Sequence, residues 1–480
     1  MARAGTVNLE NLTALGLEKL AQLVFDGAGR DAAFRKMVAA AMAGAKGPKA
    51  IAALVDRRLA ALERAKAMVE WNKTKAFGDE LAVFEKAIVI ELGKADPSMA
   101  AARLLRFIAC HEAVFERIDD SSGRIQSVYH DAIADLGPLL AAMPEADRAL
   151  VPDQIMALMA EQTHGYLTHV VAAAVKSVPP SALRQWDADL ARRQAVASKA
   201  PVKKHDWSRQ AKISQLIGCR QEIASALGDL DGFIALELTK EKNAQDPFDL
   251  AERLFRAGRY AEALGWIKRE GGRSLGYITH AGMADGTHHD AFFAPKTALE
   301  AAILEKLGRA GEGQTLRWDH FKQSLNVQIL RDYVAKLGDF DEFDALDRAF
   351  AHVAACPASY EALSFFLEWP RLDLAAKLVI ERRAKWSGAH YSIIAPAAKA
   401  LEEKYPAAAT ILFRALLDDI LVRGKSPAYG HGARYLVKLK ELAPACDAAA
   451  VPNMETHAAF SARIDKSHGR KAAFWALMPS

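Results

Sequence analysis

Two short helices joined by a tight turn are predicted by the stretch Asp246-Pro247-Phe248-Asp249-Leu250-Ala251-Glu252-Arg253-Leu254-Phe255-Arg256-Ala257-Gly258-Arg259-Tyr260-Ala261-Glu262-Ala263-Leu264. Leu250 and Leu254 are four residues apart, so they share one face of the first helix. Gly258 suits the turn because it has no Cβ, and the small side chain of Ala263 lets the second helix approach closely. We therefore predict a helical hairpin over these residues.

This hairpin resembles one unit of the tetratricopeptide repeat, in which Gly-Arg-Tyr-x-Glu-Ala-Leu begins the second helix. Similar turns follow at Leu307-Gly308-Arg309 and Leu337-Gly338-Asp339, with weaker echoes in 360–378 and 397–416. Apart from one long insertion after the first hairpin, the turns fall roughly 30–36 residues apart, close to the period of that repeat. The resemblance implies a solenoid of stacked hairpins with an extended concave surface.

The first part of the chain also shows helical periodicity. A helix is expected from Pro48 to Val69, where apolar residues recur at steps of three and four. Asp96-Pro97-Ser98 is a typical capping segment for the next one. Further helices are expected over 81–92, 125–142, 151–162 and 165–177. The predicted fold class is all-α, with an N-terminal helical domain and a tetratricopeptide-like solenoid in the C-terminal half.

Three segments are expected along the chain. The apolar pattern weakens between 191 and 221, where eight Lys and Arg residues face the single acid Asp206. Pro201 discourages helix in the residue before it, and few bulky apolar side chains anchor this part of the chain. We therefore predict an N-terminal helical domain over 1–190, a basic linker over 191–221 and a helical-repeat domain over 222–480.

A second resemblance rests on four short motifs: Asp119-Asp120-Ser121-Ser122-Gly123, Gly258–Leu264, Leu307–Trp318 and the terminal His468-Gly469-Arg470-Lys471 followed by Phe474. Together they resemble a group of uncharacterised bacterial helical proteins, which is similar to the helical C-terminal region of SWIM zinc-finger proteins. The closely spaced C-x-C and C-x-H ligands of the zinc finger are missing from this sequence. The resemblance therefore implies a helical fold, and no zinc or DNA-binding role comes with it.

No familiar catalytic motif is complete in this sequence. The four cysteines are about a hundred residues apart and form no C-x-x-C pair, so we expect them to be buried, reduced and inert. His111-Glu112 begins like a zinc-protease helix, but Phe115 stands where the second histidine is needed. No phosphate-binding loop is present. Gly272-Arg273-Ser274-Leu275-Gly276 has the Gly-x-Ser-x-Gly spacing, but no strand is predicted before it, so it presents no nucleophile elbow. We assign no catalytic or cofactor-binding residue and expect a protein that is not an enzyme.

The insertion over 271–290 gathers polar side chains. His280, His288, His289 and Asp290 lie within eleven residues of a Gly-rich stretch. Imidazole and carboxylate groups can bind Zn²⁺ or a similar ion if a loop folds them together, and binding groups often lie on such loops. The favoured interpretation is a solvated surface loop. Contact with a partner or ligand and a metal site are the alternatives.

The basic segment contains the candidates for nucleic-acid contact. Lys203, Lys204 and Arg209 can neutralise phosphates, and Trp207 can stack on a base. The plainer alternative is a solvated connector whose tryptophan packs on a helix. The net charge of +4 is too small to indicate a nucleic-acid coat protein.

The leading functional prediction is a non-catalytic scaffold or adaptor that binds a peptide or protein partner on its helical-repeat surface. The alternatives are nucleic-acid association through 191–221, and a metal-dependent enzyme that uses the His280–Asp290 loop. The N-terminal residues lack the apolar core of a secretory signal, and no run of 18 apolar residues occurs. We therefore expect a cytoplasmic protein without a membrane partner.

Overall fold

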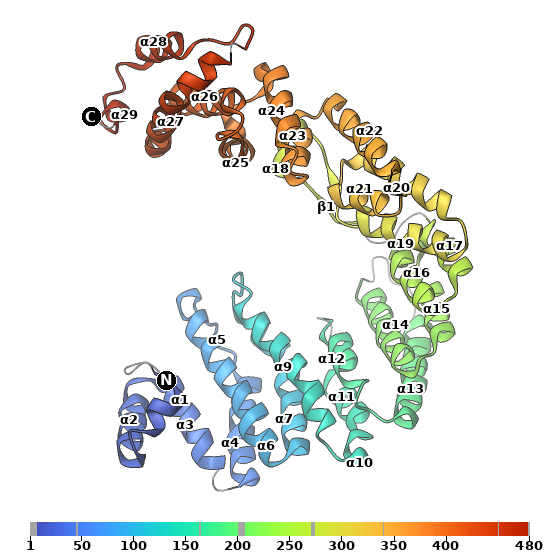
Figure 1. Ribbon diagram of the computed structural model, residues 1–480. Helices are drawn as coiled ribbons and strands as arrows, with labels where there is room; N and C mark the ends of the chain where they lie inside the picture. The colour runs from blue at the N-terminus through green and yellow to red at the C-terminus, as the bar shows by residue number, and fades with distance from the viewer. Residues whose placement is uncertain are drawn as a thin grey trace. The chain divides into compact units, whose positions relative to one another are not determined.

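The computed structural model describes residues 7–44, 47–162, 165–199, 207–269, 274–338, 340–449 and 451–478. The chain divides into two compact units, Met1–Glu241 and Lys242–Ser480. Helices dominate both units, so the prediction of an all-α fold is confirmed (Figure 1).

The first unit contains the helices up to α15. They are α1 (Leu9–Thr13), α2 (Leu17–Arg30), α3 (Ala32–Gly44), α4 (Pro48–Arg64), α5 (Trp71–Lys86), the π-helix η1 (Ala87–Leu92), α6 (Gly93–Ala95), α7 (Pro97–Ala109), α8 (His111–Phe115), α9 (Arg124–Ala141), α10 (Glu145–Arg148), α11 (Val151–Met159), α12 (Tyr166–Ala174), α13 (Pro180–Lys199), α14 (Trp207–Leu227) and α15 (Leu230–Leu238).

Carboxylate side chains cap the starts of two helices in the first unit, at α7 as the sequence predicted and also at α9. Asp96 Oδ1 accepts a hydrogen bond from the Met99 backbone N–H at 2.9 Å, and α7 begins at Pro97. Asp120 accepts from the backbone N–H groups of Ile125 and Gln126, and so caps the start of α9. These carboxylates satisfy backbone donors that a helix leaves unpaired at its first turn.

The segment predicted as a basic linker forms the second half of α13 and most of α14 in the described residues. These two helices pack against each other, and Leu190, Leu216 and Cys219 are buried in the core of the first unit. The division between the compact units lies at 241/242, and not around 191–221. Arg192, Arg193 and Lys199 are exposed on α13, whereas Arg209, Lys212 and Arg220 are half-buried on α14. These charged side chains dilute the apolar pattern of both helices.

The second unit contains the remaining elements. They are the 3₁₀ helix η2 (Lys242–Ala244), α16 (Pro247–Arg256), α17 (Tyr260–Ile267), β1 (Gly276–Tyr277), α18 (His280–Asp285), β2 (His289–Asp290), α19 (Phe293–Lys306), α20 (Ala310–Ser324), α21 (Val327–Val334), α22 (Asp341–Ala355), α23 (Ser359–Glu368), α24 (Leu372–Glu381), the 3₁₀ helices η3 (Arg383–Lys385) and η4 (Gly388–His390), α25 (Tyr391–Leu401), α26 (Pro406–Val422), η5 (Ser426–Ala428), α27 (Tyr429–Ala448), α28 (His457–His468) and α29 (Ala472–Trp475).

The hairpin predicted over 246–264 is present as α16 and α17. Leu250, Leu254 and Ala263 are fully buried, and Gly258 has φ +75° in the turn. The Arg259 backbone N–H closes the turn with a bond of 2.9 Å to the Leu254 carbonyl. Helices commonly end with a glycine at positive φ, after which a backbone N–H donates to the carbonyl five residues earlier, as Arg259 does here.

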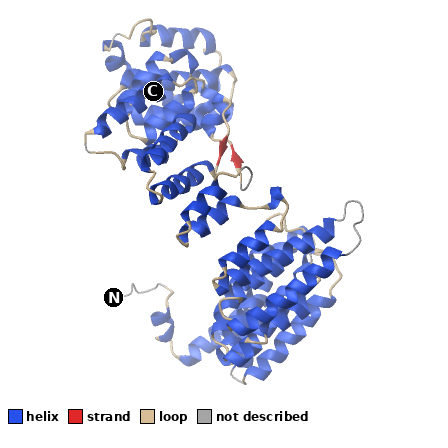
Figure 2. Ribbon diagram, turned by 90° about the vertical axis from the view of Figure 1, so that its right-hand side faces the viewer, coloured by secondary structure: helices blue, strands red, loops and turns tan. Residues whose placement is uncertain are grey.

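The insertion after this hairpin forms a small docked structure. Its strands β1 and β2 pair antiparallel, with Tyr277 opposite His289, and α18 lies between them in the sequence (Figure 2). Helix α18 packs against α23 and α25. The insertion is therefore partly ordered by contacts with later helices. Among the described residues, no helix is both long and apolar enough to cross a membrane.

Candidate binding site in the second unit

The insertion is fastened to the first turn of α23 by Asp285. Its Oδ2 accepts hydrogen bonds from the backbone N–H groups of Tyr360 and Glu361, each at 2.8 Å. Helix α23 has no capping side chain of its own, because Ala358 stands at its N-cap position. Asp285 therefore caps this helix from a segment about 75 residues earlier in the chain.

Glu361 makes the second set of contacts with the insertion. Its Oε1 accepts hydrogen bonds from Thr279 Oγ1 at 3.0 Å and Thr287 Oγ1 at 2.9 Å. The same oxygen lies 2.8 Å from His289 Nε2. The three donors come from both sides of α18, so one carboxylate oxygen ties the segments before and after that helix to α23. The other oxygen, Oε2, accepts no hydrogen bond from the described part of the chain.

Asp290 orders the ends of the insertion. Its Oδ1 accepts from the backbone N–H of Phe292 at 2.9 Å and from that of Leu275 at 3.0 Å. The hydrogen bond from Phe292, with that from Leu275, holds the pKa of this carboxyl below its usual range. Asp290 is therefore an anion at neutral pH.

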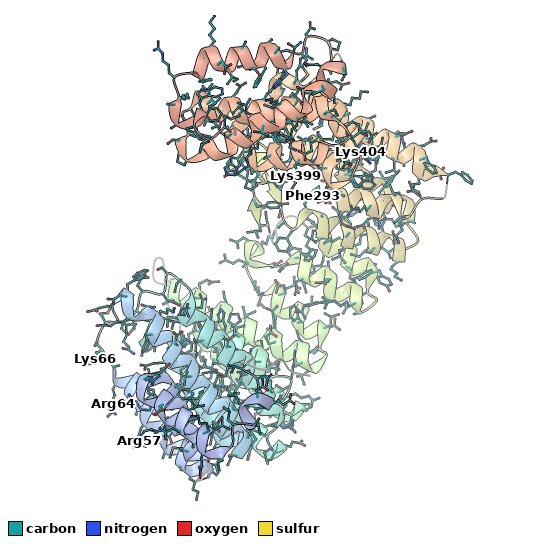
Figure 3. All side chains as sticks on the ribbon, turned by 60° about the vertical axis from the view of Figure 1, so that its left-hand side comes forward. Arg57, Arg64, Lys66, Phe293, Lys399 and Lys404 are labelled. Atoms are coloured by element: carbon teal, nitrogen blue, oxygen red, sulfur yellow. The ribbon has the colours of Figure 1, made fainter. Side chains whose placement is uncertain are left out.

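A cavity of about 540 Å³ opens between the insertion and the helices on which it rests. Tyr277, His289 and Asp290 line one side, and Glu361 lines it from α23. Phe293 at the start of α19 adds a second aromatic ring, which lies against His320 with ring centroids 4.6 Å apart (Figure 3). The volume is in the range of ordinary ligand pockets.

The cysteines differ from expectation at one position. Cys110, Cys219 and Cys446 are buried, and burial raises the pKa of Cys110 and of Cys219 to about 12. Cys356, at the end of α22, is only half-buried and is one of the residues that line the cavity.

The four metal candidates are placed differently from one another. His288, His289 and Asp290 line the cavity, whereas exposed His280 begins α18 and is not among the lining residues. His289 hydrogen-bonds Glu361, and Asp290 accepts backbone donors. No group of three or more His, Cys, Asp or Glu side chains in the described ranges is arranged to hold a metal ion.

The cavity also contains a residue that the sequence did not single out. Glu361 is separated from His289 by 72 positions, and nothing in the local pattern Ser359-Tyr360-Glu361 marks it except that a carboxylate is common in the first turn of a helix. Only the docking of the insertion brings it to the site.

The candidates for nucleic-acid contact fall partly outside the described residues. Lys203 and Lys204 lie there, and nothing is described of the Trp207 side chain at the start of α14. The Arg209 guanidinium donates to the backbone carbonyls of Ala197 at 2.8 Å and Ser198 at 2.5 Å. Other cations of the segment pair with acids: Arg192 and Arg193 with Asp189, Lys212 with Glu161, and Arg220 with Asp187.

Basic side chains also lie on an early helix. Arg57, Arg64 and Lys66 follow one another along one side of the first unit (Figure 3). Arg57 and Arg64 are two helical turns apart on α4, and each donates from Nε to a carbonyl of its own helix. The neighbouring Arg58 is paired with Glu80 at 3.1 Å.

Comparisons with known proteins add a family but no activity. A search of the curated proteins and a search of the solved structures each found no match. The similarity to SWIM zinc-finger proteins and to the tetratricopeptide repeat therefore stays a prediction. One family model matches residues 2–477, nearly the whole chain. The chain thus belongs to this family, DUF6880, a family of unknown function.

Proposed function

We propose that this protein is a non-catalytic scaffold that binds a peptide or protein partner through its helical-repeat unit. The observation that carries the proposal is the open cavity of about 540 Å³ formed where the insertion docks on α23. Its walls are held by hydrogen bonds that are already made in the free protein. A preformed site loses little conformational entropy when a partner binds.

The repeat character is part of the proposal. Gly258 and Gly308 have φ of +75° and +74°, and each is followed by an arginine that bonds a glutamate three residues on: Arg259 with Glu262 and Arg309 with Glu312. Most helices of this unit pack against the next one or two in the sequence. This is how tetratricopeptide-like hairpins stack, and such stacks commonly bind peptides.

The surface around the cavity is suited to a protein partner. The insertion exposes large apolar side chains beside the polar wall: Leu275 at 61%, Tyr277 at 46%, Ile278 at 51% and Met283 at 60%. Exposed aromatic and methionine side chains are enriched in protein interfaces. The proposal places this recognition in the cytoplasm, where no disulfide is needed for stability.

Affinity purification tests the proposal. The tagged full-length chain is recovered from its native extract at low salt, one half is treated with nuclease, and co-eluting proteins are identified by mass spectrometry. We expect a defined protein partner that survives the nuclease. If all co-eluting material disappears with the nuclease, the scaffold proposal is wrong and binding depends on nucleic acid.

Two variants test whether that partner binds in the cavity. Ala294 lines the cavity from α19, and Ala294→Phe fills it without removing any hydrogen bond. Ala298 lies one turn further along the same helix, is exposed and is not among the lining residues, so Ala298→Phe is the matched control. We expect Ala294→Phe to lose the partner and Ala298→Phe to keep it. If both variants lose the partner, or if both keep it, the cavity is not the site where the partner binds.

A further inference from the structure

The wall of the cavity in the second unit is acidic. Asp290 and Glu361 line it, and among the described residues no lysine or arginine does. Lys296 lies close enough to act on Asp290 but does not form part of the wall. The other titratable groups in the described wall are Tyr277, His288, His289 and Cys356. The cavity therefore has two carboxylates and no lysine or arginine in the described part of its wall, and Glu361 is hydrogen-bonded to His289.

One carboxylate oxygen is left over for a ligand. All three bonds from the insertion go to Glu361 Oε1, from Thr279, Thr287 and His289. Oε2 takes no hydrogen bond from the described residues, and it is not one of the polar atoms buried without a partner. Glu361 lines the cavity, so Oε2 is the oxygen of this carboxylate that no described residue occupies as an acceptor. A cation that donates to Oε2 leaves the contacts of Oε1 in place.

Two aromatic rings add to the attraction for a cation. Tyr277 lines the cavity next to His289, with ring centroids 5.5 Å apart, and Phe293 lines it from α19. The faces of such rings attract ammonium and guanidinium groups, and the attraction is stronger where water is excluded. A planar guanidinium can donate to a carboxylate and lie on an aromatic ring at the same time.

We propose that the cavity binds a basic side chain, an arginine guanidinium or a lysine ammonium, that the partner protein presents. The cation lies between Asp290 and Glu361, donates to Glu361 Oε2 and contacts the ring of Tyr277. This inference rests on the proposed scaffold function and names what the partner must contribute. The cavity is larger than one such side chain, so flanking residues of the partner also fit in it.

Small amides test this directly on the full-length protein. N-acetyl-arginine amide, N-acetyl-lysine amide and the neutral isostere N-acetyl-citrulline amide are each titrated by ligand-observed NMR. We expect saturable binding of at least one cationic amide with a Kd on the order of 1 mM, as suits so small a ligand. Citrulline amide should bind at least about tenfold more weakly, because it lacks the charge. The binding should also weaken as salt is added.

Two charge-removing variants locate the site. Glu361→Gln keeps an oxygen for the three donors, and Asp290→Asn keeps one for Leu275 and Phe292, so each removes charge and preserves the wall. Each should weaken binding of the cationic amide at least about fivefold. Glu368→Gln, at the exposed far end of the same helix α23, is the matched control and should bind as the unchanged protein does. If thermal unfolding shows that Glu361→Gln has lost its fold, Asp290→Asn decides the question.

Several results would overturn the inference: no saturable binding, equal binding of the citrulline amide, or full binding by the two charge-removing variants. These outcomes are separable from the fate of the scaffold proposal. If a nuclease-resistant partner is found but no amide binds, only the proposal that the cavity takes a basic side chain is wrong. If a cationic amide binds but no protein partner is found, only the proposal of a scaffold function is wrong.

Discussion

Glu85 is a buried acid in the core of the first unit, with 1% of its surface exposed. Lys86 Nζ lies 3.2 Å from Glu85 Oε2 and 2.8 Å from Asp135 Oδ2, so one ammonium joins both carboxylates. Burial is the main cause that raises the pKa of Glu85 to about 7. The π-helix η1 begins two residues later, at Ala87.

This pKa makes the stability of the first unit depend on pH. Between pH 4.5 and about 7 the folded chain keeps a proton on Glu85 that the unfolded chain has released, so stability falls as the pH rises through this interval. Glu85→Gln stays neutral throughout. We expect its free energy of unfolding to exceed that of the unchanged protein by about 1–2 kcal/mol at pH 8, with a smaller difference at pH 5.

Urea unfolding at both pH values measures this difference. Glu91→Gln removes a carboxylate from the neighbouring π-helix and is the matched control. The account of Glu85 is contradicted if Glu85→Gln raises the free energy of unfolding by the same amount at pH 5 and pH 8. It is also contradicted if Glu91→Gln raises this free energy in the same way.

At the scale of residues, the sequence predicted about half of the candidate site. His288, His289 and Asp290 stood out because polar groups clustered in a Gly-rich insertion, and all three line the cavity. Glu361 and Asp285 carry the contacts that build the cavity, yet each is an ordinary acid in its local pattern. Their roles depend on pairings about 75 residues apart, which neither spacing nor composition encodes.

The helical hairpin is the recurring element of the second unit. The turn between α16 and α17 requires Gly258 at φ +75°, and nothing lies within 4 Å of a Cβ placed there. A side chain at this position is therefore unfavourable because of the positive φ, and not because neighbouring atoms leave it no space. Gly265, inside α17, is equally open but lies in helical conformation.

These two glycines give opposite expectations for the same change. Gly258→Ala should lower the free energy of unfolding by about 1 kcal/mol, because a side chain disfavours positive φ. Gly265→Ala should raise it by about 1 kcal/mol, because alanine is the better helix former. Chemical denaturation of both variants measures the difference. If both changes destabilise the protein equally, the turn does not depend on the backbone of Gly258.

Elements with clear end signals were predicted well from the sequence. Pro48, Pro97 and Pro247 each begin a helix as expected, because proline fits the first turn and its missing N–H is not needed there. The helices in 191–221 give a weak periodic signal, because charged residues are frequent there and few of the described residues are buried. Helix α18 and the two-residue strands are too short for a periodic signal.

At the scale of the whole molecule, the chain consists of two compact units that divide at 241/242. Each contains its own large cluster of buried apolar side chains. Multi-unit chains of this kind often do not unfold in a single step. A substitution in one core should therefore shift mainly the unfolding transition of the unit that contains it.

Calorimetry of the full chain tests this independence. We expect two unfolding transitions. Glu85→Gln at pH 8 should raise the midpoint of one of them, and Asp285→Ala should lower the other. The latter removes two backbone contacts at the start of α23, a loss of about 1–2 kcal/mol. A single transition that both variants shift would show that the units unfold together.

The affinity of the purified partner for the cavity variants tests the scaffold account most directly. The partner is titrated into the unchanged protein, Ala294→Phe and Ala298→Phe, each first shown by thermal unfolding to be folded. The account predicts at least about tenfold weaker binding to Ala294→Phe, a loss of about 1.4 kcal/mol, and no change for Ala298→Phe. Equal affinity of all three proteins would contradict it, because the partner would then bind elsewhere on the chain.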